Sequence, residues 1–181
     1  MDDKYLTLVN NDNMFNSCFL YDIDIMNYDY FFSLERETMF SFMMLRDYLL
    51  RNGIDMRLTN AFVSVSTQIL LYRDALVKYS EKYVTDNYEE PLYTEHHTGL
   101  CFDFCIYDNG CFIYQIDDVK RKIILDAAFR LGFILRYPKG KENITGHRYE
   151  PNHLRYVGIK NADIINSNDL CLEEFINCKI K

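Results

Sequence analysis

Histidines and carboxylates at metal-ligand spacing are the residues of this chain best suited to chemistry. All four histidines lie between residues 96 and 153, and His96 and His153 each have an aspartate or a glutamate close by in the sequence. Imidazole nitrogens and carboxylate oxygens are ordinary ligands of zinc in proteins. A single metal centre built from these segments is therefore the first hypothesis.

The first segment runs from Thr94 to Asp103 and reads Thr-Glu-His-His-Thr-Gly-Leu-Cys-Phe-Asp. In it a loop histidine, His96, precedes a predicted strand that reaches Asp103. Gly99 lies between them and permits a sharp backbone approach, because glycine adopts conformations that other residues avoid. The side chains of His96 and Asp103 can then meet at one point.

The second segment reads Tyr-Glu-Pro-Asn-His over residues 149–153, and Glu150 precedes His153 by three residues at a predicted turn into a strand. A catalytic zinc ion generally takes three protein ligands and leaves a fourth position for water, which it acidifies toward neutral pH. Two histidines and one aspartate can supply these ligands, while Glu150 stays free to act as a base. Each segment alone is common by chance, so the combination is the specific signal.

Taken together, the two segments resemble the ordered motifs SxHxxGxAxD and ExWH. These motifs are typical of the zinc D-alanyl-D-alanine carboxypeptidases and dipeptidases of glycopeptide resistance, the VanY, VanX and VanXY type. The resemblance covers most of the chain. The further matching stretches are Leu8-Val9-Asn10, Gln68, Gly-Phe-Ile-Leu-Arg-Tyr-Pro at 132–138, Ile-Thr-Gly at 144–146 and Arg-Tyr-Val-Gly at 155–158.

The resemblance implies a role for each residue that matches a family motif. The zinc ligands that it implies are His96, Asp103 and His153. Glu150 matches the general base that takes a proton from the attacking water. The implied substrate-binding residues are Thr94, at the position of the serine of the first motif, together with Ser64 and Gln68.

The sequence departs from the family pattern at two positions that bear on catalysis. Val63 stands where family members carry an arginine that stabilises the substrate carbonyl and the developing oxyanion, and Asn152 replaces the tryptophan of ExWH. Losing one oxyanion donor costs on the order of 100-fold to 1000-fold in turnover. The arginines that could supply a substitute cation are Arg57, Arg148 and Arg155. For each of them, pairing with a surface carboxylate is the commoner role.

The function that the resemblance implies is hydrolysis of peptidoglycan precursors that end in D-Ala-D-Ala or D-Ala-D-Ser. This activity would link the chain to cell-wall metabolism and vancomycin resistance, with Zn²⁺ as cofactor and a small peptide as partner. Val63 and Asn152 favour an alternative, a catalytically impaired zinc-binding homologue that recognises peptide termini. An L,D-carboxypeptidase or a phage-type endolysin on the same scaffold is a third option.

The remaining histidines and the cysteines are expected to take no direct part in the chemistry. His97 is expected beside the site or facing solvent, and His147 on a loop surface. The six cysteines lack paired spacing and lie mainly in apolar runs, which favours free buried thiols over disulfides or a cysteine zinc site.

Length and composition are those of one soluble globular domain. Hydrophobic residues make up 49% of the chain and charged residues 26%, which disfavours disorder. The net charge of −7 disfavours nucleic-acid binding, which needs clustered lysine and arginine. No segment approaches the roughly 20 apolar residues that cross a bilayer. Because the N-terminus also lacks the features of a secretory signal, we expect a cytoplasmic protein.

Hydrophobic periodicity predicts both helices and strands along the chain. The predicted helices are 34–50, 64–83 and 117–131, and the predicted strands are 54–63, 99–107, 111–114, 133–137 and 154–159. Asn109-Gly110 is a strong hairpin-turn signal, and 86–94 and 138–146 are predicted loops. We therefore expect one α+β domain over residues 1–181, with a small, mostly antiparallel sheet flanked by helices and a zinc site on the sheet face.

Overall fold

A five-stranded antiparallel sheet is the centre of the fold. The computed structural model describes residues 3–21 and 23–179. The strands of the sheet, in spatial order, are β3 (Asp55–Asn60), β4 (Cys101–Asp108), β7 (Glu150–Tyr156) and β6 (Phe133–Tyr137), and β5 (Cys111–Ile113) pairs with one end of β4. A separate two-stranded sheet joins β1 (Ile25–Asn27) to β2 (Ser33–Glu35). All of these pairs are antiparallel, which confirms the predicted sheet type.

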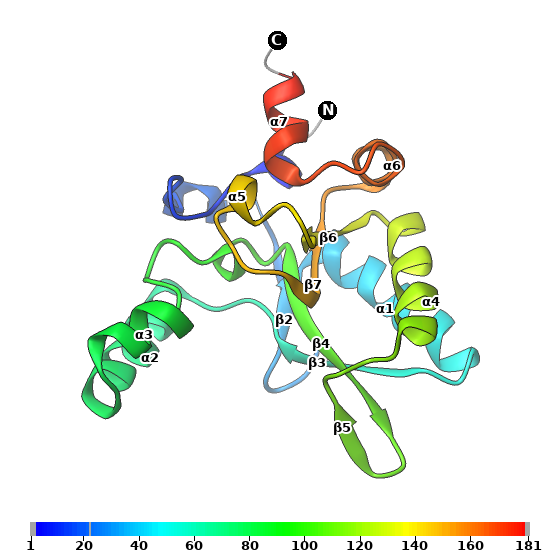
Figure 1. Ribbon diagram of the computed structural model, residues 1–181, viewed down its shortest axis with the longest axis horizontal. Coiled ribbons are helices and arrows are strands. Elements are labelled where there is room, and N and C mark those ends of the chain that lie inside the picture. The colour runs from blue at the N-terminus through cyan, green and yellow to red at the C-terminus, as the bar shows by residue number, and fades with distance from the viewer. Residues whose placement is uncertain (1–2, 22, 180–181) are drawn as a thin grey trace.

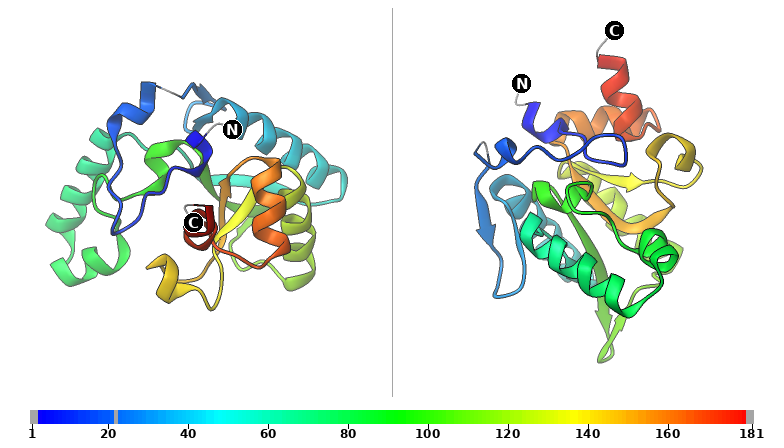
Figure 2. Two further views of the ribbon diagram at one scale, coloured as in Figure 1. Left: turned by 90° about the horizontal axis from the view of Figure 1, so that it is seen from above. Right: turned by 90° about the vertical axis from the view of Figure 1, so that its left-hand side faces the viewer.

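Helices flank the sheet on both sides, as the α+β prediction requires. Figure 1 shows α1 (Arg36–Arg51) and α4 (Asp118–Arg130) on one side and α2 (Val65–Lys78) and α3 (Glu81–Asn87) on the other. At one end lie α6 (Ile159–Ser167) and α7 (Leu172–Lys179), and α5 (Glu142–Thr145) is a single turn before β7. The left view of Figure 2, from above, shows α2 and α3 apart from α1 and α4. The described residues also form short 3-10 helices η1 (Asp3–Leu6), η2 (Ser17–Tyr21) and η3 (Glu95–Thr98).

Alternation along the central strands gives the sheet one apolar face and one polar face. Phe102, Phe104 and Ile106 of β4 and Leu154 and Tyr156 of β7 belong to the main hydrophobic core, which α1 and α4 complete. Successive side chains of a strand point to opposite faces. The residues that alternate with the core set, and so face the other way, are Cys101, Asp103, Cys105, His153 and Arg155. The polar face therefore carries one histidine and one aspartate of the predicted site.

A second, smaller apolar cluster holds the two C-terminal helices against the sheet. Its buried members are Ile134, Val157, Ala162, Ile165, Leu172 and Phe175. Ile134 comes from β6 and Val157 directly follows β7, so the cluster joins α6 and α7 to the edge of the sheet. In the described part of the chain no helix is both long enough and apolar enough to span a membrane.

Elements with strong local signals were predicted correctly. β6 has the predicted bounds, and α1 and α4 lie close to the predicted helices. Asp117 caps α4 by accepting a hydrogen bond from the backbone N–H of Lys120. Asn109 and Gly110 form the turn between β4 and β5 with φ values of 48° and 83°, a left-handed conformation that both residue types tolerate.

Other predicted boundaries were wrong. The predicted helix 64–83 is two helices, because the backbone at Tyr79 is extended and Ser80 caps α3, which continues into the predicted loop 86–94. The predicted loop 138–146 contains α5. The predicted strand 154–159 instead begins at Glu150 and ends at Tyr156, so Glu150 and His153 lie on a strand rather than in a turn.

The cysteines are free thiols, as predicted. None of the six forms a disulfide, and Cys101, Cys105 and Cys171 are buried. The other three, Cys18, Cys111 and Cys178, are exposed, so the expectation of burial holds for half of the set.

A buried cluster of charged side chains connects distant parts of the chain on the polar side of the sheet. Glu95 is fully buried, and its Oε1 accepts hydrogen bonds from Arg136 Nε at 2.8 Å and from Arg155 Nη1. Arg136 also donates two hydrogen bonds to Glu173 of α7, at 2.9 and 2.7 Å. Burial alone would raise the pKa of Glu95, but the two guanidinium groups outweigh burial and hold that pKa well below its usual range.

We predict that Glu95→Gln lowers the free energy of unfolding by about 3–5 kcal/mol at pH 7, because it leaves two buried guanidinium groups without their shared counter-charge. Thermal and urea unfolding of the metal-free protein measure this loss. As a control, Asp126→Asn removes an exposed pair with Lys122 and should cost less than about 1 kcal/mol.

We also expect the stability difference between wild type and Glu95→Gln to depend on pH. Because the folded-state pKa of Glu95 is lowered, its stabilising effect is present above its unfolded pKa of about 4.3 and is lost as the pH falls through the folded value. The stability difference between wild type and Glu95→Gln should therefore shrink below about pH 4. A difference that grows toward acid pH would contradict the assigned ion pairs.

Candidate metal centre

Strand pairing brings Asp103 and His153 together. Asp103 on β4 is the direct cross-strand partner of His153 on β7, and both lie on the polar face. Directly opposite residues of an antiparallel pair have Cβ atoms about 4.5–5.5 Å apart, close enough for their side chains to share one ligand. The register of β4 and β7 thus brings together two predicted ligands that lie far apart in the sequence.

A short 3-10 helix presents His96 to the same point. Thr94 caps η3, its Oγ1 accepting a hydrogen bond from the His96 N–H at 3.3 Å. Gly99 ends η3 with φ 67°, and a Cβ there would lie 2.6 Å from Cδ1 of Ile25 and 3.0 Å from the backbone N of Glu35. Only glycine suits this position, because it needs both a left-handed backbone and close packing.

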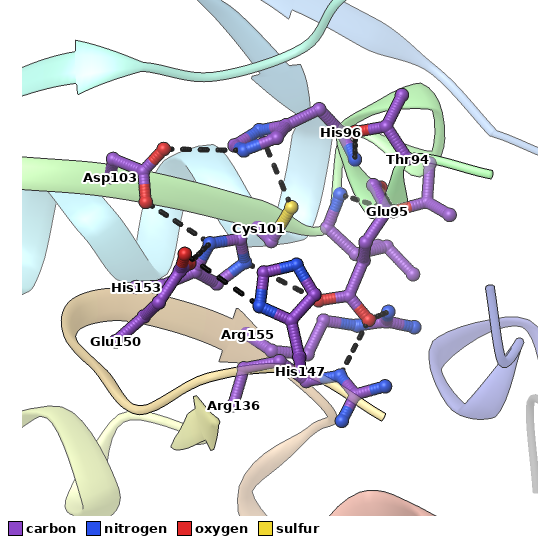
Figure 3. A network of polar contacts seen from close by, with 12 residues as sticks. Thr94, Glu95, His96, Cys101, Asp103, Arg136, His147, Glu150, His153 and Arg155 are labelled. Carbon is purple, nitrogen blue, oxygen red and sulfur yellow. Dashed lines mark hydrogen bonds and ion pairs between the residues drawn. The ribbon is translucent and has the colours of Figure 1, made fainter. Parts of the chain in front are cut away.

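Both predicted histidine ligands have a ring nitrogen next to the carboxylate of Asp103 (Figure 3). Nε2 of His96 lies 3.3 Å from Oδ2 of Asp103, and Nδ1 of His153 lies 3.0 Å from Oδ1 of the same carboxylate. The other nitrogen of His96, Nδ1, donates a hydrogen bond to the backbone carbonyl of Ala61 at 2.8 Å, since a carbonyl can only accept. This contact leaves the Nε2 lone pair of His96 directed toward Asp103.

These distances fit a zinc ion. Zinc binds nitrogen and oxygen donors at about 2.0–2.2 Å in a tetrahedral arrangement, which places neighbouring donor atoms about 3.3 Å apart. The two separations to Asp103 are close to that value. Burial would raise the pKa of Asp103, but His153 and His96 outweigh burial and hold that pKa well below its usual range, so the side chain is a carboxylate at neutral pH.

In the part of the chain that the structure describes, two groups of three residues each bring one donor atom within 4.8 Å of one another. The first group is Asp103, Glu150 and His153, and the second is His96, Cys101 and His153, so neither is the predicted ligand set. Cys101 Sγ is 3.5 Å from Nδ1 of His96, on the side of the ring that faces Ala61. Burial would raise the pKa of the Cys101 thiol, but His96 and His153 lower it overall. Cys101 does not line the cavity described below, whereas Asp103 does.

Glu150 stands beside the converging donors. Its Oε2 is 3.6 Å from Nδ1 of His153, the nitrogen that also faces Asp103. The side chain is about a quarter exposed and lines the cavity, so a water molecule next to the donors would be within its reach. This position suits the predicted general base.

The site opens into a cavity of about 800 Å³ between the polar face of the sheet and the helices α2 and α3. His96, Asp103, His153 and Glu150 all line it. Of the predicted substrate-binding residues, Thr94 and Gln68 line it as well. Ser64 is not among the lining residues, and its hydroxyl caps α2 by accepting from the N–H of Thr67.

The two departures from the family pattern lie in different places. Val63 lines the cavity, and its backbone carbonyl accepts a 2.6 Å hydrogen bond from Nδ1 of His97. His97 is buried and braces this segment, which excludes the solvent-facing alternative. Asn152 is not among the lining residues, and its side chain binds Arg121 and the carbonyl of Tyr114.

The structure separates the three arginines that could supply a substitute cation. Arg155 is fully buried against Glu95, and Arg57 pairs with Asp55 away from the cavity. Arg148 lines the cavity, and its Nε lies 3.4 Å from Oε1 of Glu150. Among the described residues that line the cavity, Arg148 is the one lysine or arginine.

Three residues near the site were missed or misplaced. Glu95 directly precedes His96, yet nothing in its local sequence signals that its Oε2 lies 3.4 Å from Nε2 of His153. Glu89 lines the cavity from the segment that follows α3. His147, predicted on a loop surface, also lines the cavity, with Nε2 3.3 Å from Oε1 of Glu89, so that prediction was wrong.

Comparison with known proteins gives a family and several relatives. The family model described as VanY, D-alanyl-D-alanine carboxypeptidase, matches residues 32–159. The putative carboxypeptidase YodJ of Bacillus subtilis (strain 168) is 35% identical over 133 residues, which are 72% of this chain and 48% of that protein. The chain thus spans about half the length of this relative.

Solved structures share the fold. VanYB in complex with D-alanine-D-alanine is 26% identical, with a TM-score of 0.79 and coverage of 96% of this chain and 97% of that one. A vancomycin resistance D,D-pentapeptidase VanY mutant in complex with Zn(II) is 24% identical, with a TM-score of 0.80 and coverage of 96% and 99%. With the family model matching most of its length, the chain belongs to the VanY family of D-alanyl-D-alanine carboxypeptidases.

Proposed function

We propose that the chain is a zinc-dependent D,D-carboxypeptidase or D,D-dipeptidase that hydrolyses the D-Ala-D-Ala or D-Ala-D-Ser end of peptidoglycan precursors. One observation carries the proposal. His96 and His153 each have a ring nitrogen 3.3 or 3.0 Å from a carboxylate oxygen of Asp103, on a wall of the cavity that Glu150 also lines. The VanYB complex with D-alanine-D-alanine supports the choice of substrate.

In this proposal each protein group has a defined task. A bound zinc ion would polarise the scissile carbonyl and acidify the attacking water. Glu150 accepts the proton of that water through its Oε2 as the new carbon–oxygen bond forms, and then returns the proton to the leaving amine as the carbon–nitrogen bond breaks. Asp103 and the two histidines hold their donor atoms in place throughout.

The cavity also contains groups suited to a peptide end. Thr94 offers a buried hydroxyl, and the amide of Gln68 fixes the wall by donating to the carbonyl of Glu89 at 2.6 Å. Arg148 is the side chain available to pair with the terminal carboxylate of a substrate. The choice of peptides in the hydrolysis test below decides whether the D-amino acid is released from a dipeptide or from a longer precursor.

A second candidate function is recognition of a peptide terminus by a zinc-binding homologue with impaired catalysis. Val63 favours it, because this apolar residue lines the cavity at the position of the family arginine. The valine side chain offers neither a charge nor a hydrogen bond to an oxyanion, so residue 63 does not stabilise the transition state through its side chain. Zinc binding and catalysis therefore need separate tests.

Zinc binding is tested first. The purified protein should bind one zinc ion, and His96→Ala or Asp103→Ala should weaken the affinity by at least about tenfold, as measured by competition with a chromogenic chelator. Cys101→Ser is the matched control, because it removes a donor of the second group and leaves the proposed ligands intact. Zinc lost in Cys101→Ser but kept in Asp103→Ala would contradict the ligand assignment.

Hydrolysis is tested on a set of peptides. The zinc-loaded protein should release a D-amino acid from D-Ala-D-Ala, D-Ala-D-Ser or a precursor pentapeptide, and Glu150→Ala should slow release by about 100-fold to 10,000-fold. A tetrapeptide ending in L-Lys-D-Ala tests L,D-carboxypeptidase activity in parallel. If no peptide is cleaved faster by the wild type than by Glu150→Ala, the chain is not this enzyme.

The consequence of Val63 is tested by restoring the family residue. Val63→Arg should raise the turnover of the D-Ala-D-Ala substrate, by up to about 100-fold, because it adds a cation beside the developing oxyanion. Val63→Met controls for side-chain length without charge. An unchanged or lower rate in Val63→Arg would mean that this chain stabilises the oxyanion by other groups.

A further inference from the structure

His147 occupies a position in the cavity that the reaction described above does not use. It lies on the loop between α5 and β7, three residues before Glu150 along the chain. Its ring stacks on Tyr137 of β6, with centroids 4.1 Å apart and planes 17° from parallel. Tyr137 is buried, so the imidazole rests on a fixed surface.

The side of the ring that carries Nε2 is held by Glu89. Nε2 of His147 is 3.3 Å from Oε1 of Glu89. Glu89 is itself positioned, because Gln68 of α2 donates to its backbone carbonyl at 2.6 Å. Burial would raise the pKa of Glu89, but contacts that include His147 lower it, so a carboxylate faces the ring at neutral pH. Stacking and this contact together fix the direction in which the other nitrogen points.

That other nitrogen points at the general base. Nδ1 of His147 is buried, lies 3.6 Å from Oε1 of Glu150 and has no hydrogen-bond partner among the described residues. Figure 3 shows the imidazole beside the carboxylate of Glu150. Catalytic hydrogen bonds are often long without substrate and shorten in the reacting complex. A movement of a few tenths of an ångström would make this contact a hydrogen bond.

The two oxygens of Glu150 therefore have different neighbours. Oε1 faces Nδ1 of His147 and Nε of Arg148, whereas Oε2 faces Nδ1 of His153 at the converging donors. A donor on Oε1 restricts rotation of the carboxylate and leaves Oε2 directed at the place where water is activated. Arg148 is largely exposed, while His147 is held on two sides.

We propose that His147 is a positioning residue that acts through Glu150: with an N–H on each ring nitrogen, it rests on Tyr137, faces Glu89 through Nε2, donates from Nδ1 to Oε1 of Glu150 and keeps Oε2 aimed at the attacking water. This inference rests on the proposed function, because it presumes that Glu150 is the base. It predicts a loss in kcat with little change in KM or in zinc affinity.

Kinetics of three variants test the role. His147→Phe keeps a ring on Tyr137 but removes both nitrogens, and it should lower kcat by about 10-fold to 100-fold, since a misplaced catalytic group costs up to about that much. His147→Asn places its amide nitrogen near the position of Nδ1 and should recover part of kcat. His147→Gln places its amide nitrogen near Nε2 and should recover little. Equal rates in Phe, Asn and wild type would overturn the proposal.

A double-mutant cycle shows whether His147 acts through Glu150. In a Glu150→Ala background, His147→Phe should lower the residual rate by less than about twofold, because the effects of residues that act as one unit are not additive. An undiminished further loss would mean that His147 acts independently, and would overturn the proposal. Zinc affinity measured by chelator competition should be the same in wild type and His147→Phe.

A measurement without turnover separates this inference from the proposed function. In long-range ¹H–¹⁵N spectra of the labelled protein, Glu150→Ala should shift the Nδ1 signal of His147, and Glu89→Gln should shift its Nε2 signal. Asp126→Asn, at an exposed pair with Lys122, is the control and should shift neither. If the wild type cleaves no peptide, these shifts still support the contact. A His147 ring that does not respond to Glu150→Ala overturns it.

Discussion

The arrangement of the proposed metal ligands depends on the buried carboxylate of Glu95. A charge without water must have its counter-charges and hydrogen bonds nearby, and Arg136 and Arg155 supply both from β6 and β7. Because Glu95 precedes His96 in η3, the same ion pairs hold this helix against the sheet. The other oxygen of Glu95 faces Nε2 of His153 at 3.4 Å, which directs Nδ1 of that ring toward Asp103. One buried group thereby orients ligands from two segments.

The charge cluster also connects the site to the periphery of the molecule. Arg136 binds Glu173 on α7, and Arg155 donates to backbone carbonyls near the N-terminus, those of Tyr5 and Thr7. On the opposite face of the sheet, aromatic and aliphatic side chains pack against α1 and α4. The sheet thus separates a mainly apolar side from a charged side. A site on a strand scaffold of this kind keeps its geometry better than one built on loops alone.

Carboxylates outnumber cationic side chains on the wall of the cavity. The carboxylates that line it are Asp86, Glu89, Glu90, Asp103 and Glu150, and Arg148 is the one lysine or arginine among the described lining residues. Val63, at the position where the family motif leads us to expect an arginine, adds no charge. A negatively charged substrate end therefore has few partners here, and the zinc ion would supply most of the positive potential. Groups that orient Glu150, such as His147, gain importance where oxyanion stabilisation is reduced.

The sequence by itself predicted the candidate donor residues and the candidate general base, and it determined the elements with strong local patterns, among them β6, α4 and the Asn109-Gly110 turn. These features depend on residue type and short-range spacing, which a single chain displays directly. Only the tertiary structure decided that Asp103 pairs with His153 across the sheet and that His147 faces Glu150. It also showed that Ser64 caps a helix and that Arg155 forms a buried ion pair with Glu95. The reason is physical: burial and strand register depend on residues far apart in the chain, and a local window contains only one partner of each contact.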